Sequence, residues 1–209
     1  MAQSEPIVFV VDDDVSVRES IEALLRHEGW RPEIFESAQQ FLAHPKPMTP
    51  SCLILDVNLP DLNGLDLQQR LAPDRTDMPI IFLTGYGDVP MTVRAMKAGA
   101  AEFLTKPFKD DVLLAAVQGA IERSREALAQ ETEKRLLQDR FQTLSGRERE
   151  VMELIVRGLL NKQVGGDLGI SEITVKAHRG KVMQKMNARS FADLVKMAAT
   201  LGLSTGRQP

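Results

Sequence analysis

The chain has 209 residues, of which 43% are hydrophobic and 26% charged, and its formal net charge is −3. This composition is typical of a globular protein and excludes disorder as the main state. The sequence contains no run of about 18 apolar residues that could span a membrane, and its first residues lack the features of a secretory signal. The single cysteine, Cys52, excludes an internal disulfide and argues against a cysteine zinc site. We therefore expect a cytoplasmic protein without a membrane partner.

The first part of the chain alternates short apolar runs with helical patterns. Runs at 7–11, 51–55 and 79–83 predict strands buried on both faces of a parallel sheet, and weaker runs at 33–35 and 101–104 bring the number to five. The intervening apolar residues recur at helical spacing; they are Val17, Ile21, Leu24, Leu25, Leu65, Leu67, Leu71, Val93, Met96 and Ala100. We therefore expect a doubly wound α/β domain with a five-stranded parallel sheet over residues 1–125.

Polar residues follow four of these runs, at the edge where such sheets bind ligands. Asp12 and Asp13 follow the first run, Asp56 and Thr84 follow two others, and Lys106 comes just after the last. Carboxylates that meet there repel one another unless a cation joins them, and their oxygens suit Mg²⁺. A lysine and a hydroxyl beside them could bind phosphoryl oxygens, which describes a phosphoryl-transfer site with a carboxylate nucleophile.

Each of these residues also has an ordinary structural interpretation. An aspartate pair after a strand is usually a helix N-cap, which is what we expect of Asp14. An isolated Lys-Pro pair is usually a turn. Their joint occurrence at four strand ends is harder to explain in that way.

Several segments together resemble the receiver domain of two-component response regulators: 11–14, 55–60, 63–64, 84–85 and 103–108, within about residues 5–125. The resemblance implies that Asp56 accepts a phosphoryl group from a sensor histidine kinase. It also implies a Mg²⁺ site, which Mn²⁺ or Ca²⁺ could occupy instead. Its ligands would be the carboxylates of Asp13 and Asp56, the backbone carbonyl of Asn58 and, mainly through water, Asp12.

The same resemblance implies roles for residues near the phosphoryl group. Lys106 would contact it and would precede a cis peptide bond to Pro107. Thr84 would move towards the phosphate, and Phe103 would turn inward to fill the space that Thr84 leaves, which makes a two-state switch.

Residues 83–91 and 95–100 are similar to a signature of the FixJ-like subgroup of this family. In that subgroup the phosphorylated receiver forms a homodimer through its fourth helix and fifth strand. The resemblance implies a dimer face here at Val89, Pro90, Val93, Arg94 and Lys97. The alternative for these residues is an ordinary solvated helix surface.

A long helix is predicted after this domain. Residues 111–140 are rich in helix formers, no proline occurs between Pro107 and Pro209, and Asp110 and Asp111 are a good N-terminal cap pair. We expect the last helix of the first domain to continue as a helical linker over 126–142. Its apolar residues keep no clean heptad repeat, which favours a solvated connector over a coiled coil.

Charge is distributed unevenly between the two ends of the chain. Residues 1–125 carry 12 Lys and Arg against 19 Asp and Glu, whereas residues 141–209 carry 11 against 6. An acidic part followed by a basic part indicates two domains with different partners, the second of them a nucleic-acid-binding module over 143–209.

This second domain is predicted to be all-α with four helices. They begin near Ser145, Asn161, Ser171 and Ser190, and Ser145 forms a capping box with Glu148. Two of these helices are joined by a turn that contains glycine, as in a helix-turn-helix.

The third of these helices has two distinct faces on a helical wheel. Val175, Val182 and Met186 form its core stripe. The opposite face holds Lys176, Ala177, Gly180, Lys181 and Gln184. Small residues beside lysines allow close approach to the DNA major groove, although simple solvation would also explain such a face.

Residues 144–151, 158–164 and 170–179 strongly resemble the LuxR-type DNA-binding domain. The resemblance implies contacts to base edges by Lys176 and Ala177, with Gly180 lacking the side chain often found at its position. It implies phosphate contacts by Thr174, Arg179, Lys181 and Asn161. One departure from the family pattern is the pair at 165–166, where glycines replace the usual alanine and a better helix former. We expect these glycines to lower the local stability of the helix by about 1–2 kcal/mol.

These features predict a FixJ-like transcription factor that is no enzyme beyond its own phosphorylation and dephosphorylation. Its expected partners are a sensor histidine kinase, promoter DNA, a second copy when phosphorylated, and RNA polymerase. An aspartate-nucleophile phosphohydrolase would need a second carboxylate two residues after Asp56, where Asn58 stands. A LuxR-type regulator that responds to a small molecule, or acts without phosphorylation, stays an alternative, although only one Trp and one Tyr are present to line a ligand pocket.

Overall fold

The structure is a computed structural model that describes residues 5–71, 75, 77–85 and 88–203. The chain divides into two compact units, Met1–Ala129 and Gln130–Pro209. Within the described ranges, no helix has both the length and the apolar character that a membrane span requires.

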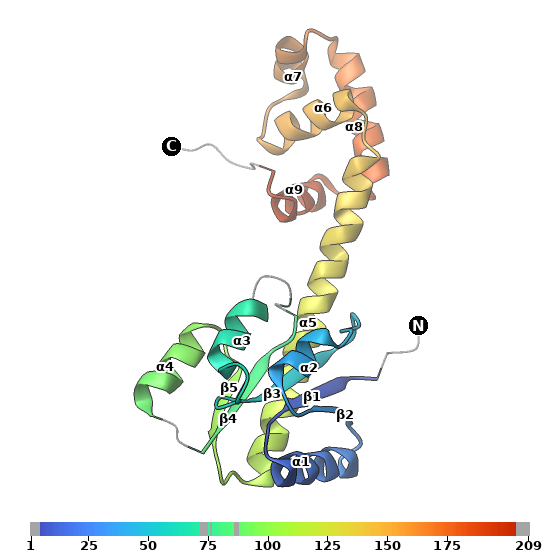
Figure 1. Cartoon of the computed structure of the whole chain (residues 1–209). Helices are drawn as coiled ribbons and strands as arrows, with labels where there is room; N and C mark the ends of the chain where they lie inside the picture. The colour runs from blue at the N-terminus through green and yellow to red at the C-terminus, as the bar shows by residue number, and fades with distance from the viewer. Residues whose placement is uncertain (1–4, 72–74, 76, 86–87, 204–209) are drawn as a thin grey trace. The chain divides into compact units, whose positions relative to one another are not determined.

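The first unit is built around five parallel strands in the order β2-β1-β3-β4-β5 (Figure 1). They are β1 (Ile7–Val11), β2 (Arg31–Phe35), β3 (Ser51–Asp56), β4 (Ile80–Thr84) and β5 (Glu102–Thr105). The predicted sheet is confirmed, with strand ends displaced by one or two residues. Every residue of β1, β3 and β4 is buried, whereas β5 lies at the edge and is partly exposed, which explains its weaker apolar signal.

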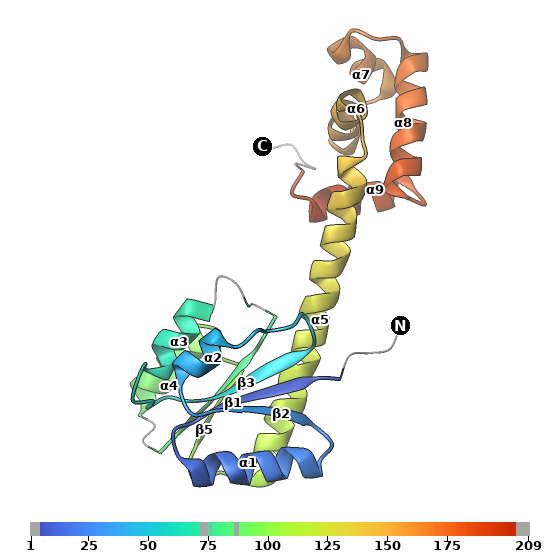
Figure 2. The same cartoon turned by 45° about the vertical axis from the view of Figure 1, so that its right-hand side comes forward.

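Helices cover both faces of this sheet (Figure 2). One face carries α1 (Val15–His27) and the first part of α5 (Asp110–Gln142), and the other carries α2 (Ala38–Ala43), α3 (Gly64–Leu71) and α4 (Val89–Lys97). Because side chains alternate along a strand, Val8 and Val10 pack with Ile21 on the α1 side, while Phe9 and Val11 pack on the other.

The helices α1 and α2 both begin at residues whose backbone N–H groups are bonded by side chains. Asp14 caps α1 by accepting a hydrogen bond from the Ser16 backbone N–H, as predicted. The sequence did not predict α2, because its six residues are too few for a helical period. Its start is stabilised by Ser37 and, from a distant loop, by the Asp61 carboxylate, which accepts bonds from the backbone of Gln39 (2.9 Å) and its neighbour.

The predicted long helix is present as α5, which has 33 residues. Leu113, Val117 and Ile121 are buried in the first unit, and Leu137 is buried in the core of the second. Residues 129–136 are exposed.

The second unit contains four further helices, α6 (Gly146–Val156), α7 (Asn161–Leu168), α8 (Glu172–Met186) and α9 (Phe191–Thr200). The capping box is present: the Ser145 N–H donates to the Glu148 carboxylate (2.8 Å), and the Glu148 N–H donates to the Ser145 hydroxyl (3.3 Å). Between α7 and α8 the chain turns at Gly169, whose φ of +67° suits a residue without a β-carbon. The predicted helix-turn-helix is therefore formed.

Candidate functional site

Three aspartates meet at the carboxyl edge of the sheet because β1 and β3 are neighbours in register. Asp12 follows β1 and is fully buried, Asp56 is the last residue of β3 and is 6% exposed, and Asp13 faces solvent. Their carboxylate oxygens lie within 4.8 Å of one another. Such a set of hard oxygen ligands is consistent with a divalent metal site.

Lys106 supplies the positive charge that this acidic cluster needs. Its Nζ donates to Asp12 Oδ2 at 2.6 Å and to Asp56 Oδ2 at 2.5 Å. Burial lowers the pKa of Lys106, but the hydrogen bonds to Asp12 and Asp56 outweigh that effect and leave the pKa above its ordinary value. The ammonium is therefore held in its charged form between the two carboxylates. The peptide bond from Lys106 to Pro107 is cis, as expected.

The environment of Asp12 differs from that of an exposed carboxylate. Burial raises the pKa of Asp12, and the bond from Lys106 offsets that rise only in part. The Arg18 guanidinium also bonds the backbone carbonyl of Asp12 at 2.6 Å. The role of Arg18 was not predicted from the sequence, although its place one turn into α1 puts it within reach of the edge.

The other residues expected near Asp56 lie around it. The Asn58 backbone N–H donates to Asp56 Oδ1 at 2.9 Å. Thr84 is the buried last residue of β4, and its carbonyl accepts a bond from the Lys106 backbone N–H at 2.7 Å. Phe103 on β5 is half-buried, with its ring centroid 6.1 Å from that of Phe82.

Gly64 has a positioning role that the sequence motif alone did not reveal. A β-carbon at this position would lie 2.5 Å from the Asp56 carbonyl oxygen and 3.0 Å from the Val57 α-carbon. The first turn of α3 therefore packs directly on the backbone that presents Asp56.

The expected dimer residues lie on the outer surface of α4. Asp88 caps this helix, Pro90 stands in its first turn, and Ala95 is its buried residue. Val89, Pro90, Val93, Arg94 and Lys97 are all exposed. Val89 is 76% exposed, so an apolar surface faces solvent there.

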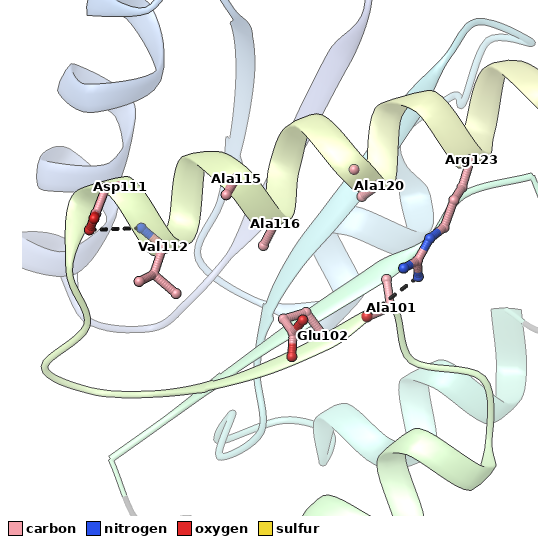
Figure 3. A pocket seen from close by; sticks show the side chains of 9 residues that line it. Ala101, Glu102, Asp111, Val112, Ala115, Ala116, Ala120 and Arg123 are labelled. Atoms are coloured by element: carbon pink, nitrogen blue, oxygen red, sulfur yellow. Dashed lines mark hydrogen bonds between the residues drawn. The ribbon is translucent and has the colours of Figure 1, made fainter.

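A groove of about 440 Å³ lies between β5 and α5 (Figure 3). Its lining consists mainly of small α5 side chains, with Glu102 and Arg123 at its side, where Arg123 bonds the Ala101 carbonyl at 3.5 Å. The groove contains none of the residues of the acidic edge, so it is a separate surface feature.

In the second unit, α8 divides into the two faces that the helical wheel predicts. Val175, Val182 and Met186 are fully buried. The five residues of the opposite face are exposed: Lys176, Ala177, Gly180, Lys181 and Gln184. Lys176 pairs with Glu172 one turn earlier at 3.3 Å, a solvent-exposed pair that contributes little to stability.

The residues expected to contact phosphates differ in their surroundings. Lys181 is exposed, whereas Thr174, Arg179 and Asn161 are half-buried. Arg179 donates to the Asn161 side-chain oxygen at 3.2 Å and lies 4.7 Å from the centroid of the Phe191 ring. Arg179 therefore connects α7, α8 and α9, in addition to any contact with DNA.

The two adjacent glycines of α7 are not equivalent. A β-carbon at Gly165 would lie 2.8 Å from the Ile170 carbonyl oxygen, whereas one at Gly166 would meet nothing within 4 Å. Gly165 thus permits the close approach of α7 to the turn before α8, and its low helix propensity has a packing reason that the sequence did not show. At Gly166 no close contact offsets the expected loss of helix stability that glycine causes.

Comparisons with family models place known domains on both units. Residues 8–118 match the model described as "Response regulator receiver domain", and residues 142–198 match "Bacterial regulatory proteins, luxR family". The first match contains the acidic edge, and the second contains α7 and α8.

Two similar proteins align with this chain over nearly its full length, and therefore across both matched domains. The chain is 52% identical to Nodulation protein W of Bradyrhizobium diazoefficiens, covering 97% of this chain and 89% of that protein. It is 44% identical to the transcriptional regulatory protein FixJ of Azorhizobium caulinodans, covering 98% and 96%.

A solved structure of the response regulator StyR is also similar, with 47% identity, a TM-score of 0.81 and coverage of 94% of this chain and 99% of that one. FixJ is named as a transcriptional regulatory protein, and StyR as a response regulator. The chain therefore belongs to the FixJ-like response regulators, which join a receiver domain to a LuxR-type DNA-binding domain.

Proposed function

We propose that a sensor histidine kinase phosphorylates this response regulator on Asp56, and that phosphorylation promotes homodimerisation and promoter binding. The observation that carries the proposal is the arrangement of Asp12, Asp13 and Asp56 within 4.8 Å, with Lys106 bonded to two of them. We assign the receiver to residues 1–125, the helical linker to 126–142 and the DNA-binding domain to 143–209.

Asp56 is suited to be the acceptor because hydrogen bonds to both of its carboxylate oxygens hold it in place. Its Oδ1 accepts the Asn58 N–H and its Oδ2 accepts from Lys106. In the transfer, a carboxylate oxygen of Asp56 forms a bond to phosphorus while the bond from phosphorus to the histidine nitrogen of the kinase breaks, and the proton needed by that nitrogen comes from solvent. Lys106 provides a positive charge beside the transferred group.

A divalent metal fits this site because its candidate ligands are all hard oxygens. The carboxylates of Asp12, Asp13 and Asp56 and the backbone carbonyl of Asn58 would hold Mg²⁺, with Mn²⁺ or Ca²⁺ as substitutes. The bound ion supplies positive charge that reduces the repulsion between these carboxylates and the phosphoryl oxygens.

Thr84 and Phe103 are the proposed switch. Thr84 ends the strand beside β3, and Thr105 of β5 pairs with it in register. A bond from the Thr84 hydroxyl to a phosphoryl oxygen would draw its side chain towards Asp56, and the half-buried Phe103 ring could then turn inward. We propose that this change favours dimer formation through Val89, Pro90, Val93, Arg94 and Lys97.

The DNA contacts are proposed for α8 and for the first residue of α7. Lys176 and Ala177 contact base edges and Gly180 permits close approach, while Thr174, Arg179, Lys181 and Asn161 contact phosphates. In a dimer, two such helices would read half-sites about one helical turn apart. Promoter-bound dimers would then act on RNA polymerase in the cytoplasm.

Phosphorylation of Asp56→Asn by labelled phosphoramidate with Mg²⁺ tests the acceptor. We expect no label on this variant and full labelling of Asp66→Asn, a matched change at an exposed carboxylate on α3. Chelation of the metal should abolish labelling of the wild type. Undiminished labelling of Asp56→Asn would show that Asp56 is not the acceptor.

A further inference from the structure

The DNA-binding unit exposes an isoleucine at the start of α8. Ile173 is the second residue of this helix and is 80% exposed. No other large apolar side chain in the part of the chain that the structure describes is exposed to that degree. Leaving an isoleucine side chain in water is unfavourable. Because Ile173 is so exposed, packing within the unit does not explain why an isoleucine stands at this position.

Ile173 lies on the same helix face as the proposed base contacts. Lys176, Ala177 and Gly180 follow it by three, four and seven residues, which is the spacing of one face of an α-helix. All of them are exposed, and the core residues of α8 lie on the other side. Ile173 therefore extends the proposed DNA-facing surface towards the helix N-terminus.

The chemistry of this face favours DNA over a protein partner as the occupant. The face carries Lys176 and Lys181, and the acidic residue nearest to it, Glu172, is paired with Lys176. Ala177 and Gly180 leave room for close approach, since a β-carbon at Gly180 would meet nothing within 4 Å. A basic face with small residues at its centre can therefore approach a polyanion such as DNA closely.

The apolar character of Ile173 limits which part of the DNA it can contact favourably. Its side chain has no hydrogen-bonding group, so it cannot form a hydrogen bond with a phosphate oxygen or with the polar edge of a base. The thymine 5-methyl group is the apolar feature of the major groove, and the N-terminal residues of a recognition helix are the ones that contact base edges.

We infer that Ile173 is a specificity-determining residue that contacts a thymine methyl group in each operator half-site. This inference rests on the proposed DNA-binding function of α8 and deepens it by naming one base and the atom group that is read. Ile173 adds preference for thymine at one position, whereas the lysines add most of the affinity.

Replacement of thymine by uracil tests the contact, because uracil lacks only the 5-methyl group. Operators are first selected from a random duplex pool with the full chain treated with phosphoramidate and Mg²⁺. Each thymine of the selected half-site is then replaced by uracil, one at a time, and the Kd is measured by fluorescence anisotropy. For the wild type we expect one replacement to weaken binding about fourfold, the effect of one methyl group withdrawn from water.

The same duplexes are measured with Ile173→Ala, for which we expect that uracil penalty to disappear. Ile173→Val keeps an apolar branched side chain and should keep most of the uracil penalty. Leu160→Ala is the matched control, because Leu160 is also 70% exposed but precedes α7 and lies outside the α8 face; it should keep the full penalty.

Equal uracil penalties in the wild type and Ile173→Ala would overturn the inference, as would a selected half-site in which no thymine methyl group matters. Either result would leave specific DNA binding intact. If the full chain selects no sequence at all, the proposed DNA-binding function fails and the inference fails with it, so the two failures are distinguishable.

Discussion

Gly64 and Asp56 are in such close contact that a β-carbon on Gly64 would lie 2.5 Å from the Asp56 carbonyl oxygen. The Gly64 N–H also donates to the Val57 carbonyl at 2.9 Å. Helix α3 thus begins directly against the backbone that carries the proposed phosphoacceptor, and the position of Asp56 depends on a residue without a side chain.

Gly64→Ala should therefore disturb the site as well as the fold. The methyl group would push against backbone atoms, which yield less easily than a flexible side chain, so we expect a loss of roughly 1–3 kcal/mol in stability. We also expect slower labelling by phosphoramidate with Mg²⁺, since Asp56 would be displaced from Lys106. Thermal unfolding and initial labelling rates measure the two effects.

Gly119→Ala is the matched control for that substitution. Gly119 lies on the exposed side of α5, and a β-carbon there would meet nothing within 4 Å. It should raise stability by up to about 1 kcal/mol through helix propensity and leave labelling unchanged. If Gly64→Ala labels at the wild-type rate, the close contact does not position Asp56.

Lys176→Ala should weaken specific DNA binding by roughly 1–3 kcal/mol and relax preference at one base position. Its exposed pair with Glu172 contributes little to folding, so the melting temperature should stay the same. Lys196→Ala, a change at an exposed lysine on α9, is the control. A uniform loss of affinity for every sequence would instead identify Lys176 as a phosphate contact.

The two α7 glycines should respond differently to alanine. Gly166→Ala fills open space and should stabilise the second unit by about 0.5–1 kcal/mol, because alanine loses less backbone entropy in a helix than glycine. Gly165→Ala should gain less or lose stability, since its methyl group would meet the Ile170 carbonyl oxygen. Urea unfolding followed by circular dichroism gives both values, and equal gains would contradict the packing role of Gly165.

The ion pair between the buried Glu148 and the exposed Lys185 should make the stability of the second unit depend on pH. The hydrogen bond from Lys185, at 2.6 Å, and the Ser145 backbone N–H lower the pKa of Glu148 from 4.5 to about 2. A carboxyl group with a depressed folded-state pKa contributes its full stabilisation above pH 4.5, and this is lost as the pH falls towards 2.

Glu148→Gln keeps a capping-box side chain but removes the charge. We expect it to be less stable than the wild type by on the order of 2 kcal/mol at pH 7, with the difference narrowing as the pH falls from 4.5 to 3. Calorimetry across this range measures the narrowing. A difference that stays constant with pH would show that the charge of Glu148 contributes nothing.

Much of the fold was predictable because it depends on local patterns. Buried parallel strands need continuous apolar runs, as at 7–11, and helix starts need capping side chains such as Asp14 and Ser145. The acidic edge was also predictable, since parallel strands bring their carboxyl ends to one side. The roles of individual residues in binding a metal, a phosphoryl group, a partner copy or DNA stay predictions.

The residues that the sequence did not predict share one property: they act through hydrogen bonds to the backbone of other residues. Arg18 bonds the carbonyl of Asp12, and Asp61 stabilises the start of α2 from a loop more than twenty residues away. Helix α2 itself has too few residues for a periodic signal. None of these contacts leaves a pattern in the neighbouring sequence.

The sequence by itself determined the two domains, the order of their elements apart from α2, and the residue types collected at the sheet edge and on α8. Apolar periodicity, capping and charge act over a few residues and can therefore be recognised locally. Only the tertiary structure decided which glycines are required by close packing, which cation pairs with which carboxylate, and that Ile173 is left exposed beside the lysines of α8. The physical reason is that burial, close approach and ion pairing depend on distances between segments that the chain brings together only on folding.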